Sequence, residues 1–314
     1  MKGLELSEKF YFEYGEPMLK EKFPELMPFI AVGLAGGGSE CLGYDDETSR
    51  DHDFEPGFCI FLPDESVLDR RSEFLLERAY SKLPMEFMGY KRSLLKPVGG
   101  NRHGVIRMSE FFAAKTGNER GELSIRDWFF LSEQSLLEAT NGKIFYDGLG
   151  EFTAIRESIS YMPEDVRLKK LAGNLLVMGQ AGQYNYSRCA LRGESGAAQL
   201  ALAEFVKSAL SVIFLINKKY LPYYKWSFYA LCELPVLFEL GGVLEYLISS
   251  GNCEAEIEKK QSLVESVCGA VADALARVGL SDVDGNDMER HAYAVNKRIS
   301  DSDIRNLHIL YAVW

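Results

Sequence analysis

The sequence predicts an α+β fold, in which an N-terminal domain with a mixed sheet and flanking helices precedes an all-α helical bundle. Short apolar strands alternate with helical segments up to about residue 150, and from Asp165 onward the apolar periodicity is helical almost throughout. A chain of 314 residues also exceeds the usual size of one hydrophobic core. We therefore expect two domains, residues 1–160 and 161–314, with the boundary near residues 157–164.

The composition is that of a globular protein and excludes several function classes. Hydrophobic residues make up 47% of the chain, and the net charge of −11 disfavours a broad phosphate-binding surface for nucleic acid. Six cysteines without a CxxC pair, together with only four histidines, give no zinc-ligand cluster and are typical of reduced thiols. The N-terminus lacks the apolar core of a signal peptide, and apolar runs such as Ala209–Ile216 are too short to span a bilayer. We expect a cytoplasmic protein that binds neither nucleic acid nor membrane.

In the first half, periodicity and turn residues predict alternating elements. They are a helix over Leu4–Lys20, a strand over Phe29–Val32, a strand through Phe58, Ile60 and Leu62, a helix over Ser66–Lys82 capped by Ser66, a strand through Val105, Ile106 and Met108, a helix over Ser124–Thr140 and a strand over Lys143–Tyr146.

In the second half, Pro and Gly residues separate six predicted helices. These are Val166–Arg192, Gly196–Lys219, Tyr223–Leu234, Pro235–Ser249, Glu254–Val278 and Asp287–Arg298.

The functional signal is the stretch from Phe29 to Pro63, where a glycine-rich turn follows an apolar strand. The turn does not fit a P-loop, because Ser39 and Glu40 follow Gly38 where the motif needs Lys and Ser or Thr. It does not fit the dinucleotide fingerprint GxGxxG either. A turn of small residues nevertheless lets backbone amides and the Ser39 hydroxyl approach the phosphates of a nucleotide.

Two aspartates, Asp51 and Asp53, precede the next strand. On an extended chain, side chains at i and i+2 point to the same side, so both carboxylates can hold one Mg²⁺ together with phosphate oxygens. Such a metal neutralises charge on a transferring phosphoryl group. A solvated acidic loop, continuous with Asp45, Asp46 and Glu47, is the competing interpretation.

These motifs resemble the nucleotidyltransferase superfamily typified by DNA polymerase beta, whose signature is a Gly-Ser turn followed by an Asp-x-Asp strand. More narrowly, the chain resembles an uncharacterised bacterial family of nucleotidyltransferase-like proteins, and its two-domain plan is similar to that of aminoglycoside nucleotidyltransferases. The resemblance is carried by GGGSECLGYDDETSRDHDFEPGFCIFLPDE (Gly36–Glu65), LSEQSLLEATNGKIFYDGLGEFTAIRE (Leu131–Glu157) and INKKYLPYYKW (Ile216–Trp226).

The resemblance implies a role for each of these residues. The turn residues Gly37, Gly38 and Ser39 would hold the triphosphate, Asp51 and Asp53 would be catalytic metal ligands, and Lys225 would contact phosphate or substrate. The helical domain would close the cleft.

A third carboxylate on a later strand usually activates the acceptor hydroxyl in this superfamily. Here that strand places Arg107 at an inward position, which leaves Glu110, or Glu194 or Glu204 of the helical domain, as candidates. The four histidines are expected to be structural or exposed.

Together these features predict a transferase that uses Mg²⁺ (or Mn²⁺) to move a nucleoside monophosphate, AMP from ATP as first choice, to a hydroxyl of a small molecule or protein. The alternative is a catalytically inactive nucleotide-binding or regulatory module of the same fold.

Overall fold

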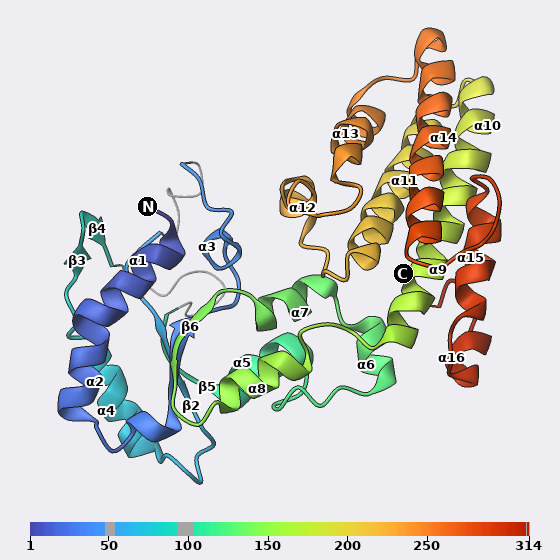
Figure 1. Cartoon of the computed structure of the whole chain (residues 1–314). Coiled ribbons are helices and arrows are strands. Elements are labelled where there is room, and N and C mark those ends of the chain that lie inside the picture. The colour runs from blue at the N-terminus through green and yellow to red at the C-terminus, as the bar shows by residue number, and fades with distance from the viewer. Residues whose placement is uncertain (48–53, 93–102, 312, 314) are drawn as a thin grey trace. The chain divides into compact units, whose positions relative to one another are not determined.

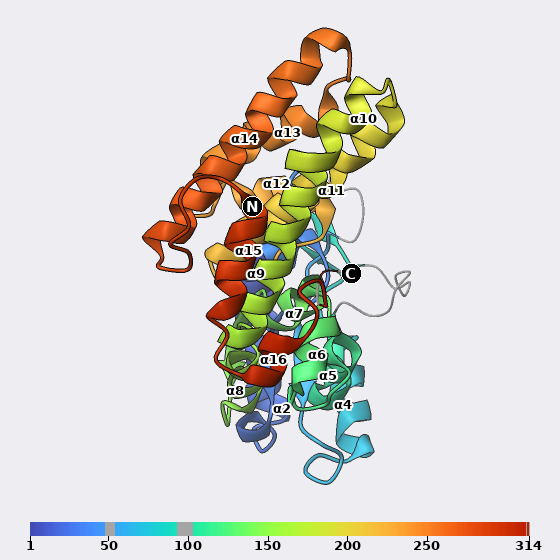
Figure 2. The same cartoon turned by 90° about the vertical axis from the view of Figure 1, so that its right-hand side faces the viewer.

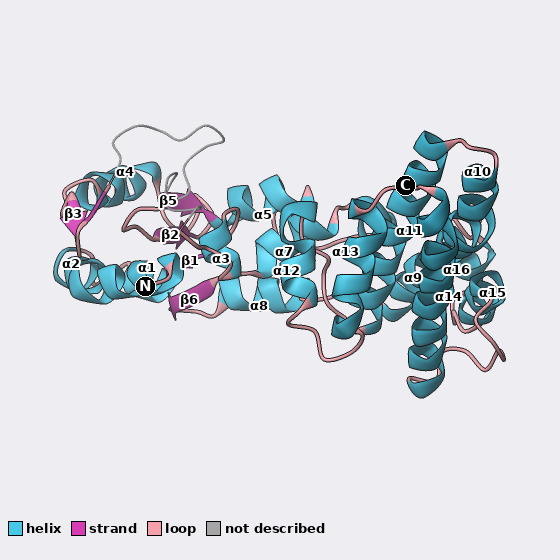
Figure 3. Ribbon diagram, turned by 90° about the horizontal axis from the view of Figure 1, so that it is seen from above, coloured by secondary structure: helices cyan, strands magenta, loops and turns pink. Residues whose placement is uncertain are grey.

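The structure is a computed structural model that describes residues 1–47, 54–92, 103–311 and 313 (Figure 1). The chain forms two compact units. The sheet unit contains Met1–Ser124 and Leu131–Ser160, and the helical unit contains Ile125–Phe130 and Tyr161–Trp314. All described strands lie in the sheet unit (Figure 3), so the fold is α+β.

The sheet unit is built on a four-stranded mixed sheet with the order β5-β2-β1-β6. Strand β1 is antiparallel to both of its neighbours, β2 and β6, whereas β2 and β5 are parallel. A separate hairpin pairs β3 with β4. The strands are β1 (Ala31–Leu34), β2 (Cys59–Leu62), β3 (Glu86–Phe87), β4 (Tyr90–Lys91), β5 (Gly104–Arg107) and β6 (Lys143–Asp147).

Helices flank this sheet. The predicted helix over Leu4–Lys20 is present as α1 and α2, joined without a break by a π-helical turn at Tyr11–Gly15. A 3-10 turn at Met27–Phe29 leads into β1. The α-helices of the unit are α1 (Gly3–Phe10), α2 (Glu16–Lys22), α3 (Ser39–Leu42), α4 (Arg70–Tyr80), α5 (Met108–Thr116), α7 (Glu133–Thr140) and α8 (Glu151–Ser158).

Alternation along the strands gives the sheet two buried faces. Val32 and Ile60, which pair across β1 and β2, join the core formed with α1, α2 and α4. Phe61 points to the other face, where its ring stacks 4.0 Å from that of Phe152 on α8 and also contacts Phe111 on α5. Helices therefore cover both faces, and polar side chains can gather only at the ends of the strands.

Three sequence predictions about local structure in the first half of the chain are wrong, and in the second half the helix predicted from Pro235 begins only at Gly241. The helix predicted from Ser66 begins at Arg70, because the carboxylate of Asp69 caps it by accepting the amide of Ser72 at 2.9 Å. Met108 starts α5 instead of extending the strand. The helix predicted over Ser124–Thr140 is two helices, α6 (Ile125–Phe130) and α7, with the Ser132 hydroxyl capping the second.

The helical unit is a bundle in which α9 packs against both α11 and α15 (Figure 2). The predicted helix over Val166–Arg192 is continuous but contains a π-helical segment at Gly179–Tyr186. Apart from α6, the α-helices are α9 (Glu164–Met178), α10 (Ser187–Leu191), α11 (Ser195–Ile216), α12 (Tyr224–Leu231), α13 (Gly241–Ser249), α14 (Glu254–Arg277), α15 (Met288–Lys297) and α16 (Ser302–Asn306).

Helix α11 is, contrary to the sequence prediction, long and apolar enough to cross a membrane by length and composition. Of its apolar window, however, 61% is buried inside the protein. Its Phe205, Val212 and Ile213 are fully buried. We therefore assign α11 as a core helix of the bundle.

Candidate functional site

The glycine-rich turn follows β1 directly and leads into α3. Gly36 and Gly38 have φ angles of 117° and 121°, a backbone region that side-chain-bearing residues rarely adopt. A Cβ atom at Gly38 would in addition clash with the carboxylate of Glu40. Gly37 and Ser39 are partly exposed. Glycine is therefore required at position 38 both by the backbone conformation and by the lack of room for a side chain. Gly37 and Ser39 are the part of the turn that solvent can reach.

A buried asparagine fixes the start of this turn. The side chain of Asn141 accepts the amide of Gly36 at 2.9 Å and donates to the carbonyl of Gly36 at 2.8 Å. Asn141 follows α7 directly. Residues more than 100 positions apart therefore hold one backbone segment in a single geometry.

An ion pair that the sequence analysis missed lies beside the same turn. Lys115, on α5, forms an ion pair with Glu138 on α7. Glu138 also accepts a hydrogen bond of 2.8 Å from Gln134, and its carboxylate lies about 3.7 Å from the position that a Cβ of Gly37 would take. Lys115 is therefore paired with a carboxylate that borders the turn, which itself lacks the lysine of a P-loop. No spacing in the sequence links Lys115 to the turn, because α5 and α7 meet only in the folded chain.

The chain that enters β2 approaches the same end of the sheet. Because β1 and β2 are antiparallel, with Gly33 opposite Cys59, the end of β1 lies beside the start of β2. Phe54 and Glu40 both lie against Gly3 at the start of α1. Asp51 and Asp53 themselves lie outside the described residues, so their pairing as metal ligands stays a prediction.

Asp45 has a structural role that the loop interpretation did not foresee. It is buried, and its carboxylate accepts the amide of Gly3 at 2.8 Å. The ammonium group of Lys2 donates to the Gly43 carbonyl at 3.1 Å. These contacts fasten the segment after α3 to the start of α1.

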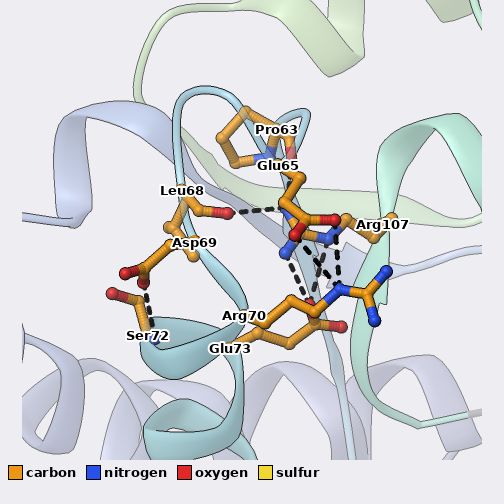
Figure 4. Close-up of polar contacts among 8 residues, drawn as sticks. All are labelled: Pro63, Glu65, Leu68, Asp69, Arg70, Ser72, Glu73 and Arg107. Atoms are coloured by element: carbon orange, nitrogen blue, oxygen red, sulfur yellow. Dashed lines mark hydrogen bonds and ion pairs between the residues drawn. The ribbon is translucent and has the colours of Figure 1, made fainter.

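The opposite end of the sheet holds Arg107, the residue at the inward strand position where the resemblance implied a third carboxylate. In the parallel pair, Gly104 lies opposite Cys59 but Arg107 lies opposite Leu62, so Arg107 is at the far end from the glycine-rich turn. Its guanidinium is buried and donates to the carbonyls of Pro63 and Leu68, at 2.7 and 2.8 Å (Figure 4).

Arg107 also donates to Glu73 through two nitrogens, at 3.1 and 2.5 Å (Figure 4). Glu110 lines a hollow of about 500 Å³ together with these residues. Arg107 is therefore a structural arginine, and Glu110 lies beside it, away from the end of the sheet that carries the glycine-rich turn.

The remaining candidates lie in the helical unit. Lys225 is exposed near the start of α12, with its ammonium group 5.0 Å from the centre of the Trp226 ring. Glu194 precedes α11, and Glu204 pairs with Lys207 at 3.1 Å. The roles of Lys225, Glu194 and Glu204 at the turn stay predictions.

One histidine lies at the near end of the sheet, although the sequence analysis set all four aside. His103 directly precedes β5, and its Nδ1 atom lies 3.4 Å from the carboxylate of Glu55. Only 11% of its side chain is exposed. Within the described part of the chain, no group of three or more His, Cys, Asp or Glu residues could hold a metal ion.

Comparison with known proteins gives one family match. A family model described as a domain of unknown function (DUF4037) matches residues 128–227. The match begins in α6, includes Asn141 and Glu138 and ends within α12, so it covers parts of both units. The comparison with curated proteins found no match.

Proposed function

We propose that this protein is a metal-dependent nucleotidyltransferase that moves a nucleoside monophosphate, AMP from ATP as first choice, to an acceptor hydroxyl. The observation that carries the proposal is the antiparallel pairing of β1 with β2. It brings the glycine-rich turn and the chain that follows Asp53 to one end of the sheet.

The sequence motifs and the described residues supply complementary parts of the proposed site. The amides of Gly37 and Gly38 and the Ser39 hydroxyl would bind the triphosphate, with Lys115 as a neighbouring cation. Asp51 and Asp53 would hold Mg²⁺ or Mn²⁺, which neutralises charge on the transferring group. The partners would be a nucleotide and a hydroxyl-bearing acceptor in the cytoplasm, without nucleic acid or membrane.

Two measurements on the full chain test this proposal. We expect calorimetry to detect binding of ATP in the presence of Mg²⁺, and we expect pyrophosphate release with a panel of sugars, polyols and hydroxyl-bearing peptides. Asp53→Asn should abolish release, whereas Asp273→Asn, at an exposed position of α14, should not change it. Wild-type release in Asp53→Asn would overturn the assignment.

A nucleotide-binding module without activity is the second candidate function. The described strand β5 carries no carboxylate, and Arg107 and Glu110 lie at the wrong end of the sheet. This observation favours a site that binds but does not transfer. Binding of ATP with Mg²⁺ but no pyrophosphate release with any acceptor would support the module.

A further inference from the structure

We infer that His103 and Glu55 form a catalytic dyad, in which His103 is the general base that deprotonates the acceptor hydroxyl. The inference rests on the proposed function, because it assigns the proton acceptor of that transfer. It names a group for the step at which the sequence offered Glu110, Glu194 and Glu204 as candidates.

The topology places His103 at the correct end of the sheet. His103 precedes Gly104, which lies opposite Cys59 in the parallel β2–β5 pair, and the amide of Gly104 donates to the carbonyl of Phe58 at 2.9 Å. The start of β2 in turn lies beside the end of β1. His103 therefore lies at the same end as the glycine-rich turn, and Arg107 at the other end.

The same topology puts the histidine and the turn on opposite sides of β2. Three adjacent strands, β5, β2 and β1, separate them by two strand spacings, or about 10 Å. Attack on the α-phosphate proceeds in line, with the acceptor opposite the leaving pyrophosphate. If the turn holds the β- and γ-phosphates, a base across β2 from it can receive the proton of an acceptor that approaches from the side opposite the leaving pyrophosphate.

Local packing holds the imidazole in place. A Cβ atom at Gly57 would lie only 2.7 Å from both Cγ and Nδ1 of His103, so the ring rests on the backbone of Gly57. Glycine at this position lets the ring approach the chain that enters β2. A side chain there would displace the imidazole, which makes Gly57 a positioning residue.

Glu55 sets the protonation pattern of the ring. Its carboxylate, 3.4 Å from Nδ1, favours the imidazole tautomer that carries its proton on Nδ1 and leaves the Nε2 lone pair to accept a proton. Nε2 has no hydrogen-bond partner among the described residues. A neutral histidine oriented by a carboxylate is an effective general base near neutral pH.

The proposed step is balanced. The acceptor oxygen forms a bond to the α-phosphorus while its proton moves to Nε2 of His103. The bond between the α-phosphorus and the bridging oxygen of the β-phosphate breaks, and pyrophosphate leaves with the electron pair. The imidazolium then returns its proton to solvent.

The first test needs no activity. Nitrogen-15 NMR of the four histidine side chains, with His103 assigned through His103→Asn, reports which ring nitrogen is protonated. We expect the Nδ1–H form for His103, and we expect Glu55→Ala to shift it toward Nε2–H. An Nε2–H form in the wild-type protein would overturn the dyad, because Nε2 then has no free lone pair.

The second test separates the dyad from the proposed function. With the acceptor found in the panel above, His103→Ala should lower pyrophosphate release about 100-fold or more and keep the wild-type affinity for ATP with Mg²⁺. Added imidazole should restore part of the rate. His308→Ala, at an exposed position in the helical unit, is the matched control and should keep the rate.

The results of these tests distinguish a failure of the dyad from a failure of the proposed transferase function. Undiminished release in His103→Ala, with activity still dependent on Asp53, would overturn the dyad and leave the transferase intact. A wild-type protein that releases no pyrophosphate with any acceptor would overturn the transferase and the dyad together.

Discussion

Asn141 and Gly36 form a two-bond pair, in which the asparagine amide binds both the N–H and the C=O of the glycine. Asn141 is 9% exposed and Gly36 is buried, so water cannot easily replace either bond. The Asn141 side chain thus binds the backbone of Gly36 as a neighbouring strand would. It fixes the chain two residues beyond the end of β1. The geometry of the glycine-rich turn depends on this pair.

Asn141→Ala should therefore lower the free energy of unfolding by about 2 kcal/mol, because two buried backbone groups lose their partners. It should also weaken ATP binding if the turn holds phosphates. Urea denaturation and calorimetry measure the two effects. The control is Asn306→Ala, at an exposed position, which should change the free energy of unfolding by no more than about 0.5 kcal/mol. If the two variants lose equal stability, the Asn141–Gly36 hydrogen bonds do not stabilise the protein.

Arg107→Lys should destabilise the sheet unit by about 2 kcal/mol, because an ammonium group cannot reproduce a fork that binds Glu73 and two carbonyls. ATP affinity should not change, since Arg107 lies at the far end of the sheet. The control is Arg70→Lys, whose side chain is 82% exposed and should lose at most about 1 kcal/mol. Loss of ATP affinity in folded Arg107→Lys would place Arg107 at the site after all.

Met88→Asn should stabilise the protein by about 0.5 to 1 kcal/mol. Met88 and Gly89 connect β3 and β4 with φ angles of 50° and 85°, and a two-residue hairpin turn with both angles positive favours Asn at its first position. Thermal denaturation measures the gain. The same substitution at exposed Met85, outside the turn, should have no such effect, and an equal gain there would argue against backbone strain.

Lys169 should make stability rise with pH in the alkaline range. Its ammonium group is buried and donates to Asn296 and to the carbonyls of Arg305 and Leu307, and this burial lowers the pKa of Lys169 below its ordinary value of 10.5. Between the folded and the ordinary pKa, the unfolded chain binds more protons, so the free energy of unfolding increases with pH.

Comparison with Lys169→Met isolates this contribution. Urea denaturation at several pH values between 8 and 10.5 should show the wild-type protein gaining stability relative to the variant as pH rises. A constant difference would show that Lys169 has the same pKa in both states. The comparison is needed because burial also raises the pKa of Tyr186 to about 12, which acts in the opposite direction above pH 10.

Local patterns predicted most elements of the fold. Alternation found the core of β2 around Ile60, and turn residues found the ends of β6. The break between α6 and α7 was missed because the apolar residues Trp128 and Leu136 fit one helical face. In the folded chain, α6 packs on α9 and α7 packs on α5, which no local periodicity can reveal.

The candidate site was harder to predict for a related reason. Gly38 and Ser39 predict a turn from local sequence, but the register of β5 against β2 determines which end of β5 lies nearer to that turn. With Gly104 opposite Cys59, His103 lies at the end near the turn and Arg107 at the far end. Strand register depends on pairing across 45 residues, so the local sequence could not distinguish the two ends of β5.

The short helix α6 gives the chain an interleaved construction. The main chain passes from one unit to the other three times, after Ser124, Phe130 and Ser160. Phe129 and Phe130 of α6 contact the ring of Tyr311, which follows α16 in the same unit. A C-terminal fragment that begins at residue 161 would therefore lack six residues of its own unit, Ile125–Phe130. A fragment of residues 161–314 that also includes residues 125–130 should therefore be more stable than residues 161–314 alone.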